Sequence, residues 1–171
     1  MKLPPPGLAD TGRPKRTFET GPVTKALRIA AVALGAALWI AVTVRFPSMP
    51  AEIPTHFGIS GEADGWGSKG SIFLLMGIFT ALLTGLTWVS HYPRSFNYLT
   101  WITEENAQQV YRRGEQMLVW LTCSMTLLFT GIVLGTIFAF NPGILIAIAG
   151  IALVVSVVAG LILTTRAGRG V

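Results

Sequence analysis

Four long apolar stretches dominate the pattern of hydrophobic and polar positions along this chain. They cover residues 26–44, 71–90, 117–140 and 144–165, and none carries a charged side chain beyond its first turn. A helix of about 20 apolar residues crosses the hydrocarbon core of a bilayer. A helix also satisfies its own backbone hydrogen bonds there, where water cannot. We therefore predict an all-α integral membrane protein, with a four-helix transmembrane bundle over residues 25–165.

The segments outside the spans differ from one another in composition. Residues 45–70 between the first two spans are rich in Gly and Pro, so we predict a loop there. Residues 1–24 are also Pro- and Gly-rich and favour a flexible tail, and residues 166–171 form a short tail at the other end. We expect one long helix that starts with Thr103 as its N-cap and continues into the third span. The turn Asn141-Pro142-Gly143 makes the last two spans an antiparallel hairpin.

The distribution of charged residues along the chain predicts the orientation of the bundle in the membrane. Only 12% of the residues are charged, against about 25% in soluble domains. All Lys and Arg residues except Arg45 and Lys69 lie before or in the first turn of the first span, between the second and third spans, or after the fourth. Positive residues concentrate on the cytoplasmic side of membranes. We therefore predict a multi-pass protein of the cell membrane, with cytoplasmic termini and an extracytoplasmic loop 45–70. The net charge of +5 then follows from topology, so the expected partner is the lipid bilayer and not nucleic acid.

The loop between the first two spans holds the candidate chemistry. Its closely spaced Gly and Pro residues predict either ordered tight turns or a very mobile loop, and Asp64-Gly65 is a typical turn pair. His56, Glu62 and Asp64 could together bind zinc or another divalent ion. Their spacing matches no named zinc motif, and His56 and Asp64 could instead bond turn amides. We expect no cofactor and no metal, with these three residues as weak candidates. Trp66 could anchor in the headgroup layer or stack on a ligand.

Small and hydroxylated side chains predict how the spans pack. Thr80 and Thr84 share one face of the second span, and Thr122 and Thr126 share one face of the third. The two faces could meet across antiparallel helices, or each hydroxyl could bond the carbonyl four residues earlier in its own helix. Gly131 and Gly135 form a GxxxG motif that allows close approach of another helix. Such faces serve an internal bundle, a homo-oligomer or a membrane-protein partner equally well.

The long run IPTHFGISGEADGWGSK, residues 53–69, directly follows the first predicted span. This run resembles the signature of the membrane family known as domain of unknown function 1648, and residues 97–113 also resemble chains that carry this domain. Some relatives are Sdp-type immunity membrane proteins, which protect bacteria from a toxin, signal its presence and carry further spans. The resemblance implies a shared fold more than a function. It suggests a binding surface at Pro54, Thr55, His56, Phe57, Gly58, Gly61, Glu62, Asp64, Gly65, Trp66, Gly67, Ser68 and Lys69.

Several function classes find no support in the sequence. Proton relays and ion pathways place ionisable groups within the membrane, and these spans have none beyond the first turn. No nucleophile elbow, HExxH, P-loop or paired-Cys motif is present. Our first hypothesis is a non-enzymatic protein with a sensing, binding or immunity-type role at the outer face, with residues 97–116 as the output. The second is an accessory subunit of a membrane transporter complex. The third is a metal-dependent membrane enzyme using His56, Glu62 and Asp64.

Overall fold

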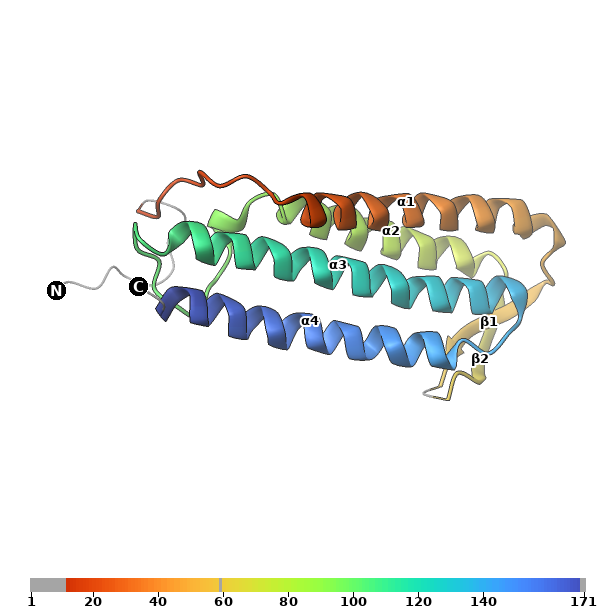
Figure 1. The fold of residues 1–171 in the computed structure, drawn as a ribbon. Helices are drawn as coiled ribbons and strands as arrows, with labels where there is room; N and C mark the ends of the chain where they lie inside the picture. Colours follow the sequence, from red (N-terminus) through yellow and green to blue (C-terminus); the bar gives the residue numbers. More distant parts are fainter. Residues whose placement is uncertain (1–11, 59, 170–171) are drawn as a thin grey trace.

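The computed structural model describes residues 12–58 and 60–169, which form an elongated helical bundle with a small β-hairpin at one end (Figure 1). Four helices are long and apolar enough to cross a membrane, which confirms the four-helix transmembrane fold. These helices are α1 (Pro22–Arg45), α2 (Ser71–Val89), α3 (Ala107–Phe138) and α4 (Gly143–Arg169). Two short 3₁₀ turns, η1 (Phe46–Ser48) and η2 (Pro93–Ser95), and two strands, β1 (Glu52–Phe57) and β2 (Ala63–Ser68), complete the fold.

Helix α3 is the central element of the bundle. It packs against α1, α2 and α4, whereas α4 packs mainly against α3. Strands β1 and β2 and the turn between α3 and α4 lie together at one end, which we call the hairpin end (Figure 1). The first and last described residues lie at the opposite end, which we call the termini end. Because α3 runs the whole length of the bundle, it connects the two ends directly.

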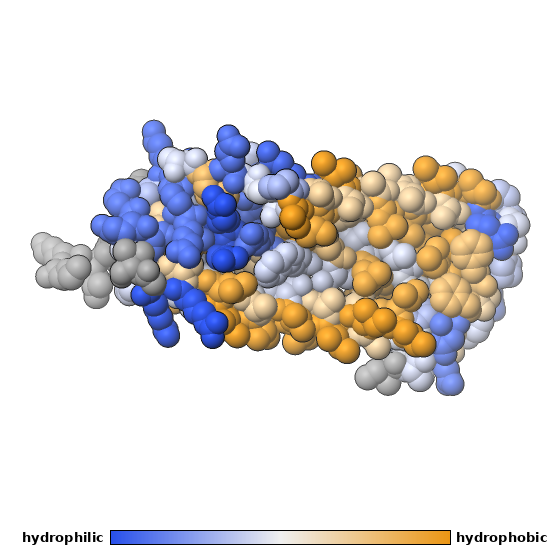
Figure 2. Space-filling view, in the orientation of Figure 1, coloured by the Kyte–Doolittle hydropathy of each residue, from blue (hydrophilic) through white to orange (hydrophobic). Residues whose placement is uncertain are grey.

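The surface of the bundle is divided into polar and apolar zones. Figure 2 shows apolar side chains over much of the helical part of this face, a strongly polar termini end and smaller polar patches at the hairpin end. Large apolar side chains are exposed on α1, α2 and α4, for example Ile40, Leu74 and Ile151. A soluble protein rarely exposes a continuous apolar surface of this extent, whereas lipid solvates it. The surface therefore agrees with a multi-pass membrane protein.

The core lies where α1, α2 and α3 meet. The rings of Phe79 on α2 and Phe129 on α3 stack with centroids 4.9 Å apart. Gly35 lets α1 approach α2 closely, because a Cβ at this position would lie 2.5 Å from a methyl group of Leu83. In lipid, such van der Waals packing holds helices together, since apolar contact with a neighbouring helix replaces apolar contact with lipid.

The small residues of α3 and α4 face each other. Gly131 lies against Leu145 of α4, and Gly135 lies against Pro142 in the α3–α4 turn. On the same interface the hydroxyls of Ser124 and Ser156 are 3.1 Å apart. The GxxxG motif of α3 is thus occupied by α4 within one chain.

Of the two alternatives for the threonine faces, the structure shows hydrogen bonding within each helix. Thr80 and Thr84 donate to the carbonyls of residues 76 and 80, and Thr122 and Thr126 donate to those of residues 118 and 122. Thr80 Oγ1 also accepts from Trp39 Nε1 of α1 over 2.9 Å. Thr84 is exposed while Phe79 and Leu83 of α2 are buried, so the two faces do not meet at Thr84.

Helix α3 continues without a break from the polar termini end into the bundle, as expected, but it starts later than predicted. Its N-cap residue is Asn106 and not Thr103. The backbone N–H of Thr103 donates to Asn106 Oδ1 over 2.9 Å, and the backbone N–H of Asn106 donates to Thr103 Oγ1 over 3.4 Å. This reciprocal pairing closes a turn before the helix, so residues 103–106 precede α3.

Residues 12–20 form a strap across the termini end, in contrast to the flexible tail expected over residues 1–24. Arg13 Nη1 donates to the carbonyl of Phe96 over 2.6 Å. Gln108 and Tyr111 of α3 donate to the carbonyls of residues 15 and 14, over 2.8 and 3.1 Å. The segment buries little apolar surface, as its composition indicates, but its backbone carbonyls accept hydrogen bonds from side chains distant in sequence. Residues 1–11 of the predicted tail lie outside the described residues.

Glu115 of α3 holds the strap and α1 together. Its side chain is 2% exposed, and it accepts hydrogen bonds from Arg28 over 2.7 Å and from Arg16 over 3.3 Å. Thr20 Oγ1 donates over 2.7 Å to Glu115 Oε1, the oxygen that also accepts from Arg28. Removing a charge from water is costly unless it is paired and hydrogen-bonded, and here the pairing is twofold. This charged cluster fixes the termini end.

Gly114 makes room for Tyr98 in the segment that links α2 to α3. A Cβ at position 114 would overlap the Tyr98 hydroxyl and ring. The Tyr98 hydroxyl donates to the carbonyl of Pro93 over 2.8 Å, and burial raises the pKa of this phenol. Gly114 therefore allows Tyr98 to pack against α3.

Candidate functional site

The region predicted as a Gly/Pro-rich loop of tight turns contains a two-stranded antiparallel sheet. Strand β1 pairs with β2 from Glu52 opposite Ser68 to Phe57 opposite Ala63. The register shifts between Pro54 and His56 and again between His56 and Phe57. Such irregularities bend a strand and increase its twist. This bend places the hairpin across the end of the bundle.

Gly65 and Gly67 allow close contact between the two strands and do not form a turn. A Cβ at Gly65 would lie 2.9 Å from the Cβ of His56, and one at Gly67 would lie 3.0 Å from Thr55 Cγ2. Both glycines therefore admit side chains of β1 that cross over β2. The predicted turn at Asp64-Gly65 is wrong, because both residues lie in β2.

The chain reverses between the strands instead, at residues 58–62. The N–H of Gly58 donates to the carbonyl of Glu62, and the N–H of Gly61 donates to the carbonyl of Gly58, both over 2.9 Å. Gly61 has φ of +81°, a conformation that residues with a Cβ rarely adopt.

Two hydrogen bonds and one apolar side chain anchor the hairpin to the bundle. Thr136 of α3 donates its hydroxyl to the buried carbonyl of Pro54 over 3.2 Å. Asn141 in the α3–α4 turn donates its amide to the carbonyl of Ser60 over 3.2 Å, and it accepts from the N–H of Gly143 over 2.7 Å. Ile53 is 1% exposed and belongs to the apolar core. The hairpin thus rests on α3 and the α3–α4 turn.

His56 and Asp64 form the one ion-pair contact of the hairpin among the described residues. Nδ1 of His56 lies 2.5 Å from Oδ1 of Asp64, and the two side chains are 72% and 54% exposed. Within the described residues, no group of three His, Cys, Asp or Glu side chains could hold a metal ion. The structure therefore joins two of the weak metal candidates, and Glu62 does not complete a site with them.

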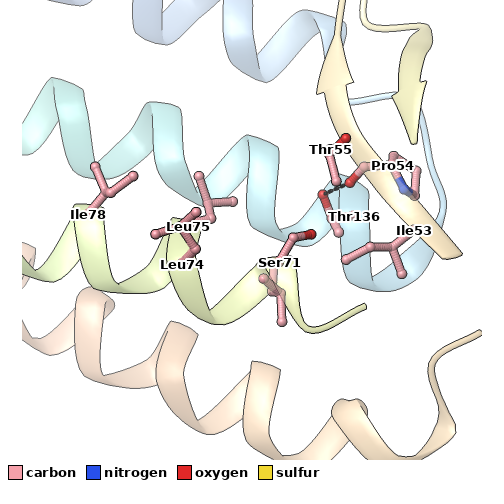
Figure 3. A pocket seen from close by; sticks show the side chains of 9 residues that line it. Ile53, Pro54, Thr55, Ser71, Leu74, Leu75, Ile78 and Thr136 are labelled. Carbon is pink, nitrogen blue, oxygen red and sulfur yellow. Dashed lines mark hydrogen bonds between the residues drawn. The ribbon is translucent and has the colours of Figure 1, made fainter. Parts of the chain in front are cut away.

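Two pockets flank strand β1. The strand–helix pocket, of about 220 Å³, lies between β1, the first turns of α2 and the end of α3 (Figure 3). Its lining is mostly apolar, with Thr55, Ser71 and Thr136 as the polar members. The turn pocket, of about 270 Å³, lies between the hairpin and the α3–α4 turn. Its lining includes the aromatic residues Phe57, Trp66 and Phe140.

The predicted binding residues divide between these surfaces. Pro54 lines both pockets, Thr55 lines the strand–helix pocket, and four predicted residues line the turn pocket: Phe57, Gly61, Glu62 and Trp66. His56 and Asp64 form their own exposed pair. Gly58, Gly65, Gly67, Ser68 and Lys69 line neither pocket. The nitrogen of Lys69 instead lies 4.9 Å from the centre of the Phe46 ring.

Several site residues were missed by the sequence argument. Thr136, Asn141 and Ser71 hold or line the site although they lie in spans and turns predicted for packing alone. Ala139, which lines the turn pocket, has φ of +53°. The Asn-Pro-Gly turn was the only available signal, since Asn in such a turn has a side chain free to bond another segment.

Comparisons with known proteins support one part of the chain most clearly. Residues 33–80 match the family model described as Domain of unknown function (DUF1648). This range covers the second half of α1, the hairpin and the first half of α2. An uncharacterized protein of Archaeoglobus fulgidus is 30% identical over 105 residues, which are 57% of this chain and 51% of that protein. The chain thus spans about half the length of this relative. No solved structure matches this chain significantly. Residues 33–80 of this chain are therefore similar to the DUF1648 family.

Proposed function

We propose that this protein is a non-enzymatic membrane protein that senses or binds a ligand at the extracytoplasmic face of the cell membrane through its β-hairpin. The observation that carries the proposal is the pair of pockets on the two sides of β1. Both are lined by residues of the signature segment together with residues of the helices on which it rests. A ligand in either pocket would contact the hairpin and the bundle at once.

Helix α3 supports a route from the hairpin to the other side of the membrane. At the hairpin end Thr136 bonds the strand, and at the termini end Glu115 bonds Arg16 of the strap. Helix α3 thus contacts the hairpin at one end, and at the other end it forms part of the candidate output segment, residues 97–116, and binds the strap. A ligand that binds more tightly to one position of α3 would increase the population of that position, and the strap would move with the helix. The size of the population shift is set by the difference between the ligand's affinities for the two positions.

The orientation rests on charge. The termini end carries Lys25, Arg112, Arg166 and Arg169 in addition to the basic residues of the strap and the Glu115 cluster. Short positively charged segments remain in the cytoplasm. The hairpin end would then face outward. An immunity-type role, in which the ligand is a toxin, draws on the resemblance to Sdp-type immunity proteins and belongs to this proposal.

The test uses a strain from which the gene is deleted. The strain is challenged with envelope stresses, including membrane-active peptides. For any stress that the strain fails to survive, a plasmid that encodes the protein is introduced to restore survival. Trp66→Ala removes the most prominent aromatic side chain of the turn pocket, which is 62% exposed. Trp88→Ala is the matched control, because Trp88 is 65% exposed on α2 near the termini end. We expect Trp88→Ala to rescue and Trp66→Ala to fail at equal membrane abundance. Full rescue by both variants would contradict hairpin-based sensing.

An accessory subunit of a transporter complex is the second candidate. It is favoured by the exposed alanines of α1, since Ala33 and Ala37 face away from the bundle, and small residues permit close approach of a partner helix. Affinity purification in mild detergent separates the candidates. A transporter that co-purifies with the wild-type protein and is lost when Ala33 and Ala37 are replaced by Leu would favour the accessory role.

A further inference from the structure

We infer that the strand–helix pocket binds an acyl chain of a membrane phospholipid, with the polar end of that lipid at the hairpin. This inference deepens the proposed function by naming a ligand class for the same site. In Figure 3, Leu74, Leu75 and Ile78 line the pocket from α2, and Ile53 and Pro54 close it from β1. The pocket thus has apolar walls along α2 and polar side chains at the hairpin, which suits a molecule with one apolar and one polar end.

The position of the pocket within the span fixes what can enter it. Ser71 is the first residue of α2 and Ile78 lies seven residues further on, which is about 10 Å along a helix. Leu74 is 69% exposed and Ile78 is 50% exposed, and both belong to a helix long and apolar enough to span the membrane. The pocket therefore opens sideways into hydrocarbon, where lipid chains are the molecules present at high concentration.

The polar rim supplies groups for the other end of the lipid. The hydroxyls of Thr55 and Ser71 have no hydrogen-bond partner among the described residues, whereas Thr136 donates to the carbonyl of Pro54. Thr55 is exposed and Ser71 is half-buried, so both hydroxyls are accessible to a lipid headgroup. The ester carbonyl of a phospholipid, which lies at this depth, is a suitable acceptor for both donors. A purely apolar partner helix would leave these hydroxyls unpaired.

The closest alternatives are a second copy of this chain and ordinary, non-selective lipid contact. Leu82 provides an internal control for both, because it follows Leu74 and Ile78 on the same stripe of α2, is 43% exposed and lies outside the pocket. Ile148, which is 51% exposed near the start of α4, is a control at similar depth on an open surface. If the pocket binds lipid selectively, its residues must contact lipid more than Leu82 and Ile148 do.

The experiment is photolabelling of the full chain in nanodiscs. The bilayer contains a small fraction of phosphatidylcholine with a diazirine in the upper part of one acyl chain, and labelled residues are mapped by mass spectrometry. We expect several-fold more label on the pocket residues Leu74, Leu75 and Ile78 than on Leu82 and Ile148. Ile78→Trp, which fills the pocket, should remove most of the excess on Leu75, whereas Leu82→Trp should leave it unchanged.

Labelling of the pocket no stronger than that of Ile148 would overturn the inference, whether the lipid contact is non-selective or a second copy covers the pocket. The wild-type pattern decides this without any variant, so misfolding of Ile78→Trp would not protect the inference. The result is also separable from the proposed function. If the pocket is not labelled selectively while Trp66→Ala still fails to rescue, the lipid site falls and hairpin-based sensing stands.

Discussion

The hairpin end and the termini end of this bundle are closed by different interactions. At the termini end, a carboxylate that is 2% exposed lies between two arginines, and a strap crosses the helix ends through several hydrogen bonds. At the hairpin end the contacts to the bundle are single hydroxyl and amide bonds to carbonyls, and the ion pair is exposed. The number of buried charges is the main difference.

This difference indicates which end can move at low free-energy cost. A buried ion pair resists the removal of either partner, because the remaining charge is left without compensation. Single bonds between neutral groups contribute only about 1 kcal/mol each. Ligand-binding segments are commonly drawn from the less stable parts of a fold. The hairpin end has the weaker attachment and the pockets, which agrees with its proposed role as the reading surface.

Replacing the buried carboxylate should have the largest effect. We expect Glu115→Ala to lower the free energy of unfolding by about 3–5 kcal/mol, because it leaves Arg28 and Arg16 near the bundle without their partner. Unfolding in mixed micelles measures the change. The matched control is Glu104→Ala, at an exposed position, which should change stability by less than about 0.5 kcal/mol. An equal effect of both variants would remove the distinction between the two ends.

The turn of the hairpin should give the next largest effect. Gly61→Ala places a side chain at φ of +81° and against Asn141 and Gly143. We expect a loss of about 1–3 kcal/mol, together with release of the hairpin seen as faster proteolysis at residues 58–62. Gly58→Ala is the control, since its Cβ would meet only an ordinary contact at 3.4 Å from Asp64 Oδ2. If Gly58→Ala is the more damaging variant, the described turn is incorrect.

The hydroxyl that joins α3 to β1 should matter less. Thr136→Val keeps the shape of the side chain and removes the donor to the carbonyl of Pro54. We expect a loss of about 1 kcal/mol, measured by the same unfolding assay. Thr130→Val removes a hydroxyl that bonds within α3 alone and should leave the hairpin unaffected. Hydrogen exchange that is unchanged at residues 52–57 in Thr136→Val would show that this bond does not hold the strand.

The exposed pair on the hairpin should have the smallest effect. We expect His56→Ala to change stability by less than about 1 kcal/mol, because water and salt screen a pair that is 72% and 54% exposed. Thermal unfolding with and without added zinc measures both the pair and the metal hypothesis. A zinc-dependent rise in melting temperature that disappears in His56→Ala would contradict this expectation.

Some parts of the fold could be predicted from the sequence and others could not. Apolar stretches with uncharged centres sufficed for the four helices, since the bilayer imposes one length and one hydrogen-bonding solution. The strands were missed because Gly65 and Gly67 indicate turns by composition. Their actual role is to admit Thr55 and His56 across the ladder. That requirement depends on pairing between strands, which local sequence does not reveal.

The termini end illustrates a second limit. Glu115 lies just before the predicted third span and was interpreted only as part of a polar helix. Its partners Arg28 and Arg16 are 87 and 99 positions away in the chain. Nothing in the local pattern pairs residues over such distances. The same holds for Thr136 and Pro54, which are separated by 82 positions.

Membrane sidedness of the two ends is best tested by labelling single cysteines on whole cells with an impermeant thiol reagent. In a Cys123→Ser background, Ser68→Cys places a thiol on the hairpin and Gln109→Cys places one at the termini end, both at exposed positions. We predict that the hairpin thiol is labelled on intact cells and that the thiol at position 109 is labelled only after lysis. Labelling in the reverse order, or of both thiols on intact cells, would contradict a membrane-spanning bundle with its hairpin outside.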